Sequence, residues 1–90
     1  MNENGLKSYA GKMFGMAQKY QQILMRSKEI HISIDAGAFG EKLFATIYCN
    51  VWKDGKLTKT ERFEINERDG FDGIFEEMEK FVEFIIPYLP

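Results

Sequence analysis

Hydrophobic and polar residues alternate along residues 43–65, in the pattern typical of two antiparallel strands joined by a tight turn. Asp54 and Gly55 lie between the two alternating runs, and Asp-Gly in this position is a strong hairpin signal. We therefore expect a β-hairpin here. The other segments of the chain make sense as elements that pair with this hairpin or cover it.

The length of the hairpin loop decides which side chains share a face of the sheet. A two-residue loop, Asp54-Gly55, would place Ala45 and Ile47 on the same face as charged residues of the second strand. A three-residue loop over residues 53–55, with Gly55 at positive φ, separates the apolar positions from the polar ones. Because a one-residue slip moves every side chain to the opposite face, burial favours the longer loop. The resulting pairs are Val51 with Leu57, Ala45 with Phe63, and Leu43 with Ile65.

This register gives the hairpin one apolar face and one mixed face. The apolar face carries Leu43, Ala45, Ile47, Cys49, Val51, Leu57, Phe63 and Ile65, interrupted only by Lys59 and Glu61. The mixed face is polar apart from aromatic residues at every fourth position, which are Phe44, Tyr48 and Trp52. It also carries Arg62, and the register places Lys56 opposite Trp52.

Residues 28–35 alternate in the same way and predict a further strand. Ile30, Ile32 and Ile34 lie on one side of it, and His31 lies on the other with the polar residues. Residues 36–42 contain two glycines and predict a connection. The simplest arrangement is an antiparallel meander in which this strand pairs with the first strand of the hairpin.

Apolar residues at three- and four-residue steps predict an amphipathic helix before the sheet. It runs from Gly5 to about Ser27, with Asn4 as its N-cap. Gly11 and Gly15 lie on its polar side, and they indicate a weak or kinked helix.

A second amphipathic helix follows the sheet, with Asp69 or Asp72 as its cap. Pro87 should stop it by Ile86. The apolar end of the chain, residues 84–90, is expected to pack either on the core or on a partner, because termini are usually polar and frayed unless they are held.

These elements predict a single α+β domain over residues 1–90 with the order α-β-β-β-α. Three strands form an antiparallel meander sheet, and both helices pack on the face that carries Ile30, Ile47 and Phe63. The opposite face is left open, and a column of exposed aromatic residues on it is typical of an interaction surface. The candidate binding residues on that face are Phe44, Tyr48, Trp52, Lys56, Arg62 and His31.

Charge is distributed unevenly along the chain. The net charge is −2, but residues 1–65 hold ten Lys and Arg against seven Asp and Glu, whereas residues 66–90 hold two against seven. The second helix is therefore acidic, as a solvated helix face or a surface for a partner. The chain has one Cys, no apolar leader and no run of the roughly 20 apolar residues that a membrane span needs, so we expect a cytoplasmic protein without a membrane segment.

The residues that carry enzyme chemistry are scarce. The chain has one His and one Cys, and Cys49 alternates into the predicted core, where a thiol is usually inert. No second His or Cys completes a metal site with either of them. We therefore expect a protein that is not an enzyme and that uses neither a metal nor a cofactor.

The predicted element order is shared with double-stranded-RNA-binding domains. In that family a lysine cluster opens the second helix, but the corresponding residues here, 69–79, are strongly acidic, and phosphate contacts need cations. Residues 28–81, and KLFATIYCNVW at 42–52 in particular, resemble single-strand-binding transcriptional coactivators of the positive-cofactor type. The predicted helix at the N-terminus replaces the extra strand of that family.

Two kinds of binding protein remain. The first, which we favour, is a protein-interaction module, such as an inhibitor, an adaptor or an accessory protein, including one of a mobile element. It would bind a protein partner or a second copy of itself, as a homodimer, through the open sheet face, the acidic second helix or the apolar C-terminus.

The second is a single-stranded nucleic-acid-binding protein whose aromatic column stacks on bases. The cations that would contact phosphates are Lys53, Lys56, Lys59 and Arg62. A further alternative is that the chain's own termini cover the aromatic column.

Overall fold

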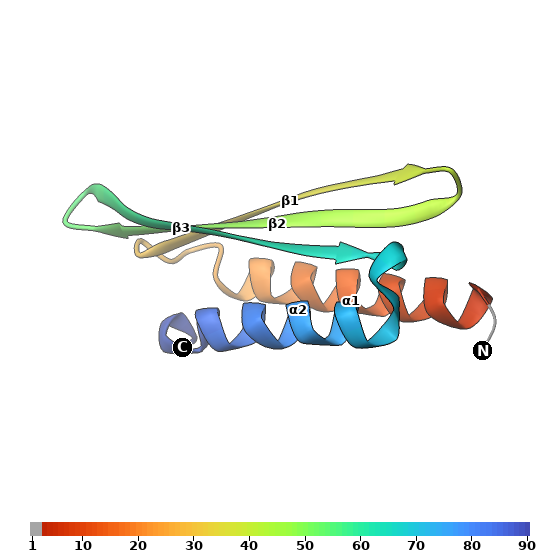
Figure 1. Ribbon diagram of the computed structural model, residues 1–90. Helices are drawn as coiled ribbons and strands as arrows, with labels where there is room; N and C mark the ends of the chain where they lie inside the picture. Colours follow the sequence, from red (N-terminus) through yellow and green to blue (C-terminus); the bar gives the residue numbers. More distant parts are fainter. Residues whose placement is uncertain (1–2) are drawn as a thin grey trace.

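The computed structural model describes residues 3–90 and contains two long helices and one sheet (Figure 1). Its elements are helix α1 (Glu3–Ile23), strands β1 (Ile30–Phe39), β2 (Lys42–Lys53) and β3 (Lys56–Asn66), and helix α2 (Gly70–Ile85). Short 3-10 helices, Glu67–Asp69 and Ile86–Tyr88, precede and follow α2. The predicted α-β-β-β-α order and the α+β class are confirmed.

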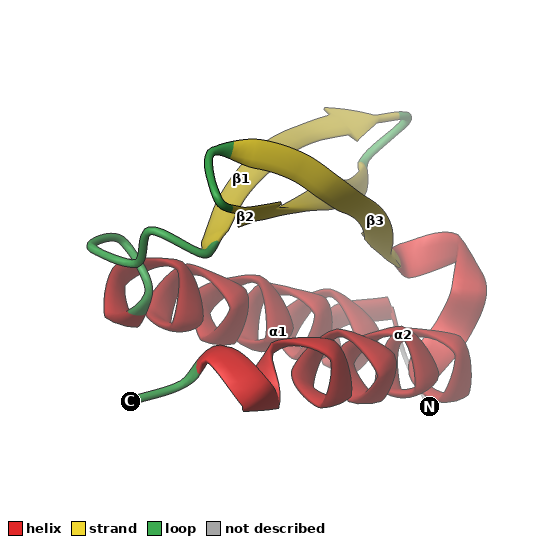
Figure 2. Cartoon of the chain, turned by 90° about the vertical axis from the view of Figure 1, so that its left-hand side faces the viewer, coloured by secondary structure: helices red, strands yellow, loops and turns green. Residues whose placement is uncertain are grey.

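The three strands form an antiparallel meander in the order β1-β2-β3, and both helices lie on the same face of it (Figure 2). The two helices run in the same direction, because Tyr9 contacts Phe71 near their starts and Tyr20 contacts Phe81 near their ends. Their ring centroids lie 5.3 Å and 6.1 Å apart, respectively. No described element covers the other face of the sheet, which we call the open sheet face.

The hydrophobic core lies between the sheet and the helix pair. Most strand residues predicted to face the helices are buried, and Phe81 of α2 packs edge-on against Phe63 at 5.7 Å. The buried apolar residues of the strands are Ile30, Ile32, Ala45, Ile47, Cys49, Val51, Phe63 and Ile65. The predicted separation of the two faces is therefore confirmed over most of the hairpin.

The loop between β2 and β3 is shorter than predicted. Lys53 pairs with Lys56, so the loop consists of Asp54 and Gly55 alone. Both residues have positive φ, 53° and 76°, which is the pattern of a type I′ turn. The predicted three-residue loop is wrong, whereas the positive φ predicted for Gly55 is confirmed.

A β-bulge reconciles this short loop with the predicted faces. Trp52 pairs with Leu57 but Val51 pairs with Lys59, so Thr58 is an extra residue in β3. The bulge shifts the register by one residue and thereby returns the apolar residues of β3 to the helix side. The resulting pairs, displaced by two residues from those predicted, include Ala45 with Ile65 and Ile47 with Phe63.

Strand β1 is longer than the alternating pattern predicted. It continues through residues 36–39, and Phe39 pairs with Lys42 across a two-residue turn. The turn residues, Gly40 and Glu41, both have positive φ. The predicted glycine-containing connection over residues 36–42 is therefore mostly strand.

The helices differ from prediction mainly at their ends. Helix α1 begins at Glu3, so Asn4 lies within its first turn rather than at its N-cap, and it continues without a break through Gly11 and Gly15. Asp69 does precede α2, but its side chain makes no capping hydrogen bond. Helix α2 ends at Ile85, which agrees with the prediction that Pro87 stops it by Ile86.

Candidate functional site

The central strand β2 carries the aromatic column along the middle of the open sheet face. Tyr48 lies between Ser33 of β1 and Arg62 of β3, which are its cross-strand partners. Its side chain is 37% exposed, and that of Trp52 is 40% exposed. Neither helix lies on this face of the sheet (Figures 1 and 2), and the exposed parts of both rings are available to a partner.

Phe44, the third ring of the column, packs against the neighbouring strand. It pairs with Gly37, and a Cβ atom built on that glycine would lie 3.0 Å from Phe44 Cζ. The ring therefore lies across β1 in the space that a side chain at position 37 would fill, and it is half-buried. Phe44 supports the sheet at this point, while Tyr48 and Trp52 form the accessible part of the column.

The bulge at Thr58 changes the surroundings of Trp52. Its partner is Leu57, which the sequence placed in the core but which is 51% exposed. Lys56 pairs with Lys53 instead of Trp52, and because paired residues share a face, it lies on the other side of the hairpin. The prediction that Lys56 lies opposite Trp52 is wrong, and an apolar residue takes its place.

The other two candidate residues lie on the open sheet face as predicted. His31 is exposed between the buried Ile30 and Ile32, and Arg62 is exposed beside Tyr48. Next to His31, Asn50 Oδ1 accepts a hydrogen bond of 2.9 Å from Thr60 Oγ1. The face thus presents rings along its middle and hydrogen-bonding groups on both sides of them.

A third exposed ring lies at the far end of this face. Phe39 is exposed, and the guanidinium carbon of Arg68 lies 5.8 Å from its ring centroid. Both residues line a shallow hollow of about 380 Å³. Its other lining residues are Lys42, Phe44, Thr46, Glu64 and Asn66. The open sheet face therefore carries aromatic residues at both ends.

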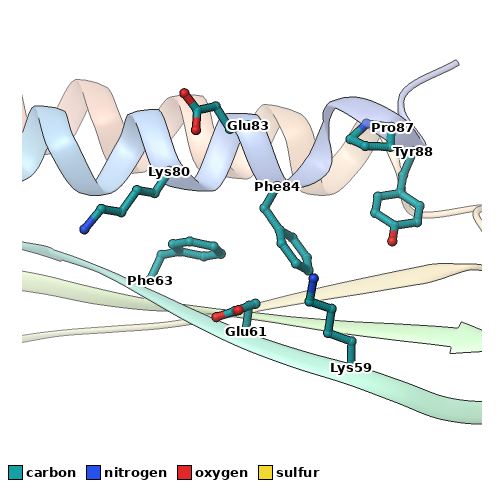
Figure 3. Close-up of a pocket in the computed structure, with 8 residues that line it drawn as sticks. All are labelled: Lys59, Glu61, Phe63, Lys80, Glu83, Phe84, Pro87 and Tyr88. Carbon is teal, nitrogen blue, oxygen red and sulfur yellow. The ribbon is translucent and has the colours of Figure 1, made fainter.

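The apolar C-terminus packs on the protein itself. Phe84 contacts Phe63 at 5.8 Å and Tyr88 at 6.3 Å between ring centroids, and Leu89 also packs against the core. Figure 3 shows Lys59 reaching over the Phe84 ring, with its Nζ atom 5.0 Å from the centroid. Of the two outcomes predicted for this segment, docking on its own core is the one observed.

The groups with enzymatic potential are separated by the sheet. Cys49 is buried on the helix side, whereas His31 is exposed on the open sheet face. Burial, and to a lesser extent the charge of Glu61, raises the pKa of the Cys49 thiol to about 12. Within residues 3–90, no three His, Cys, Asp or Glu side chains gather in a way that would hold a metal ion.

The comparisons add no relative from which a function could be transferred: no family model, curated protein or solved structure matches this chain. Among the described helices, none combines the length and the hydrophobicity required to cross a lipid bilayer.

Sequence reasoning missed three residues of the open sheet face. Leu57 was assigned to the core because the bulge at Thr58 leaves no clear signal in the sequence. Phe39 was placed in a loop because it follows Gly37, and Arg68 reaches it from beyond the end of β3. A signal for Phe39 did exist, since the Gly40-Glu41 pair can form a two-residue hairpin turn like the one at Asp54-Gly55.

Proposed function

We propose that this domain is a non-enzymatic protein-interaction module that binds a protein partner through its open sheet face. The observation that carries the proposal is the exposed cluster of Tyr48, Trp52 and Leu57 on a sheet face that neither helix covers. Aromatic residues and Arg are the usual anchors of protein interfaces, and Arg62 lies directly beside Tyr48.

The charges on the face favour a protein partner over a nucleic acid. The basic residues Lys42, Arg62 and Arg68 are interleaved with the acidic residues Asp35 and Glu64. A groove for single strands normally carries a continuous basic track, because phosphate neutralisation supplies most of the affinity. The Lys59 side chain lies over Phe84 on the helix side, which removes one of the cations expected to contact phosphates.

The size of the face suggests a transient complex. A strand of 12 residues is about 40 Å long, and three strands with their side chains are roughly 15 Å wide, so the face offers on the order of 600 Å². Stable interfaces bury about 800 Å² on each partner. We therefore expect micromolar rather than nanomolar affinity unless the partner also reaches beyond the sheet.

Site-specific photocrosslinking tests this proposal. A photoreactive phenylalanine analogue at Leu57 should give a discrete adduct in cells that express the chain, whereas the same analogue at Gln22, exposed on α1, should not. The double variant Tyr48→Ala/Arg62→Ala should lose the Leu57 adduct while it keeps its circular dichroism spectrum. If the double variant formed the Leu57 adduct in the same amount as the protein with Tyr48 and Arg62 intact, the proposed surface would be refuted.

A second candidate function is single-strand binding, which the exposed rings of Tyr48 and Trp52 beside Arg62 favour. Trp52 is the only Trp of the chain, so the Trp fluorescence of the protein reports directly on binding at this position. Quenching of its fluorescence by an oligothymidine, with an affinity that falls steeply as salt rises, would support this function over a protein partner. We expect no such quenching.

A further inference from the structure

An apolar groove of about 350 Å³ lies between α1 and α2, on the solvent side of the helix pair. We call it the helix-layer groove. Its lining residues are Tyr9, Met13 and Met16 of α1 and Phe75, Met78, Glu79, Val82 and Glu83 of α2. Met16 is 40% exposed and Phe75 is 55% exposed, so large apolar side chains stand open to solvent on both helices.

The two rims of the helix-layer groove carry opposite charges. On α1, Lys12 and Lys19 lie four residues before and three residues after Met16, so they flank it on the same side of the helix, and both are exposed. On α2, Glu79 and Glu83 line the groove itself. The surface is therefore apolar along its middle, basic on one rim and acidic on the other.

These charges have no partners within the described part of the chain. The ion pair in residues 3–90, Lys7 with Glu67, lies elsewhere, and none forms with Lys12, Lys19, Glu79 or Glu83. Lys80, the basic residue within α2, lines the hollow beside Phe63 together with Glu83, but its side chain points toward β3 while that of Glu83 points away from the sheet, and the two form no ion pair (Figure 3). The acidic rim is consequently not neutralised by its own helix.

We propose that the helix-layer groove is a homodimer interface, in which a second copy of the chain packs its own helix pair against this one. The charge pattern selects the symmetry. Because α1 and α2 run in the same direction, a two-fold axis parallel to them places each α1 over the α2 of the other copy. Lys19 of one copy, close in height to Phe81, then meets Glu79 and Glu83 of the other, and Lys12 extends the basic rim toward the start of the other copy's α2.

The alternative symmetric arrangement is disfavoured by the same charges. A two-fold axis across the helices would stack α1 on α1 and α2 on α2, so Glu79 and Glu83 would face their own copies. Like charges brought together in an interface cost free energy, whereas the parallel axis pairs opposite charges twice. Met16 and Phe75 supply the apolar contact at the centre in either case, with the methionine able to adapt its shape.

This interface is separate from the surface proposed to bind a partner. It uses the outer side of the helix pair, so the two open sheet faces of the dimer point away from each other. Such a dimer presents two copies of the Tyr48 and Trp52 surface. It gains avidity for a partner with repeated sites without any new contact.

Sedimentation velocity over a hundredfold concentration range tests the dimer. The wild-type protein should shift from the mass of one chain, 10.5 kDa, toward that of two. Phe75→Glu should weaken association at least tenfold, because it places a charge at the centre of the interface. Tyr48→Ala/Trp52→Ala should leave the association unchanged, since those residues lie on the opposite side of the molecule.

A charge exchange tests whether the charged rims meet across the interface. Lys12→Glu/Lys19→Glu and Glu79→Lys/Glu83→Lys should each remain monomeric alone, and an equimolar mixture should form a dimer, because both rims are then complementary again. The substituted side chains are exposed, so circular dichroism should show folded protein for both variants. A wild-type protein that stays monomeric across the range, or two variants that each dimerise alone, would overturn the proposal.

Discussion

The side chain of Lys7, near the start of α1, forms an ion pair of 3.1 Å with the carboxylate of Glu67, which follows β3. Glu67 is only 2% exposed, and the same carboxylate oxygen accepts a hydrogen bond from the backbone N–H of Leu43 at the start of β2. One buried carboxylate thus joins the first helix, the central strand and the segment that leads into α2. The pKa of Glu67 is lowered chiefly by the Leu43 hydrogen bond and further by Lys7, while burial opposes the shift.

Because the pKa of Glu67 lies below its ordinary value of 4.5, its charged form stabilises the folded state. That stabilisation is fully present above about pH 4.5 and is lost as the pH falls through the lower, folded-state pKa. We expect Glu67→Gln to unfold at a lower temperature at pH 7 and to lose less of its thermal midpoint between pH 7 and pH 3 than the wild-type protein does. Glu76→Gln, on the exposed side of α2, is the matched control. Equal pH dependence of wild type and Glu67→Gln would contradict this role.

The faces of the sheet were predictable from the sequence, but the pairs across it were not. Successive residues of a strand lie on opposite faces of the sheet, and burial decides only which set of alternate residues faces the core. Alternation alone therefore assigned Ala45 and Ile47 to the correct face. The predicted three-residue loop and the observed two-residue loop with a bulge at Thr58 give the same faces along most of β3. They differ only near the turn, and there Leu57 was placed on the wrong side.

Other features depended on contacts that a local pattern does not contain. Gly37 signals a loop in the sequence, but the ring of Phe44 on the neighbouring strand fills its missing side chain and allows β1 to continue. Glu67 belongs to a polar stretch, yet it is buried, and its ion-pair partner Lys7 lies 60 positions earlier in the chain. Cross-strand and long-range partners of this kind become visible only when the chain is folded.

Helix α1 should be stabilised by replacing its internal glycines. A Cβ atom built at Gly11 or at Gly15 meets nothing within 4 Å, and both lie within the helix, where Ala is favoured over Gly by roughly 0.5–1 kcal/mol. Gly11→Ala and Gly15→Ala should each raise the free energy of unfolding in urea by about this amount. Gly73→Ala in α2 is the contrast. The new Cβ atom would lie 2.6 Å from Asp69 Cβ, so this substitution should lower the free energy of unfolding. A loss of stability in both α1 variants would show that these glycines have another structural role.

The turn between β2 and β3 should be sensitive to the residue at position 55. Gly55 has a φ of 76°, in the left-handed region that a side chain disfavours by about 1–2 kcal/mol. Gly55→Ala should therefore cost about 1 kcal/mol or more in chemical unfolding, whereas Gly55→Asn should cost less, since Asn tolerates this region. Equal stability of the two variants would argue that the turn rearranges when Gly55 is replaced.

Cys49 provides a test of how tightly the space between sheet and helices is packed. Its side chain is fully buried, and burial, reinforced by the charge of Glu61, raises the pKa of the thiol to about 12. Little of the reactive thiolate therefore forms at neutral pH. A disulfide reagent at pH 8 should modify Cys49 in the native protein only as fast as the core around it opens. The stabilisation of the folded state by the neutral Cys49 thiol should be fully present below about pH 9, and it should be lost as the pH rises toward 12. A cysteine placed on the exposed surface of α1, as Gln22→Cys in a Cys49→Ala background, should react at once under the same conditions. If Cys49 in the native protein reacted as quickly as that control, the packed core between α1 and β2 would open far more readily than its burial indicates.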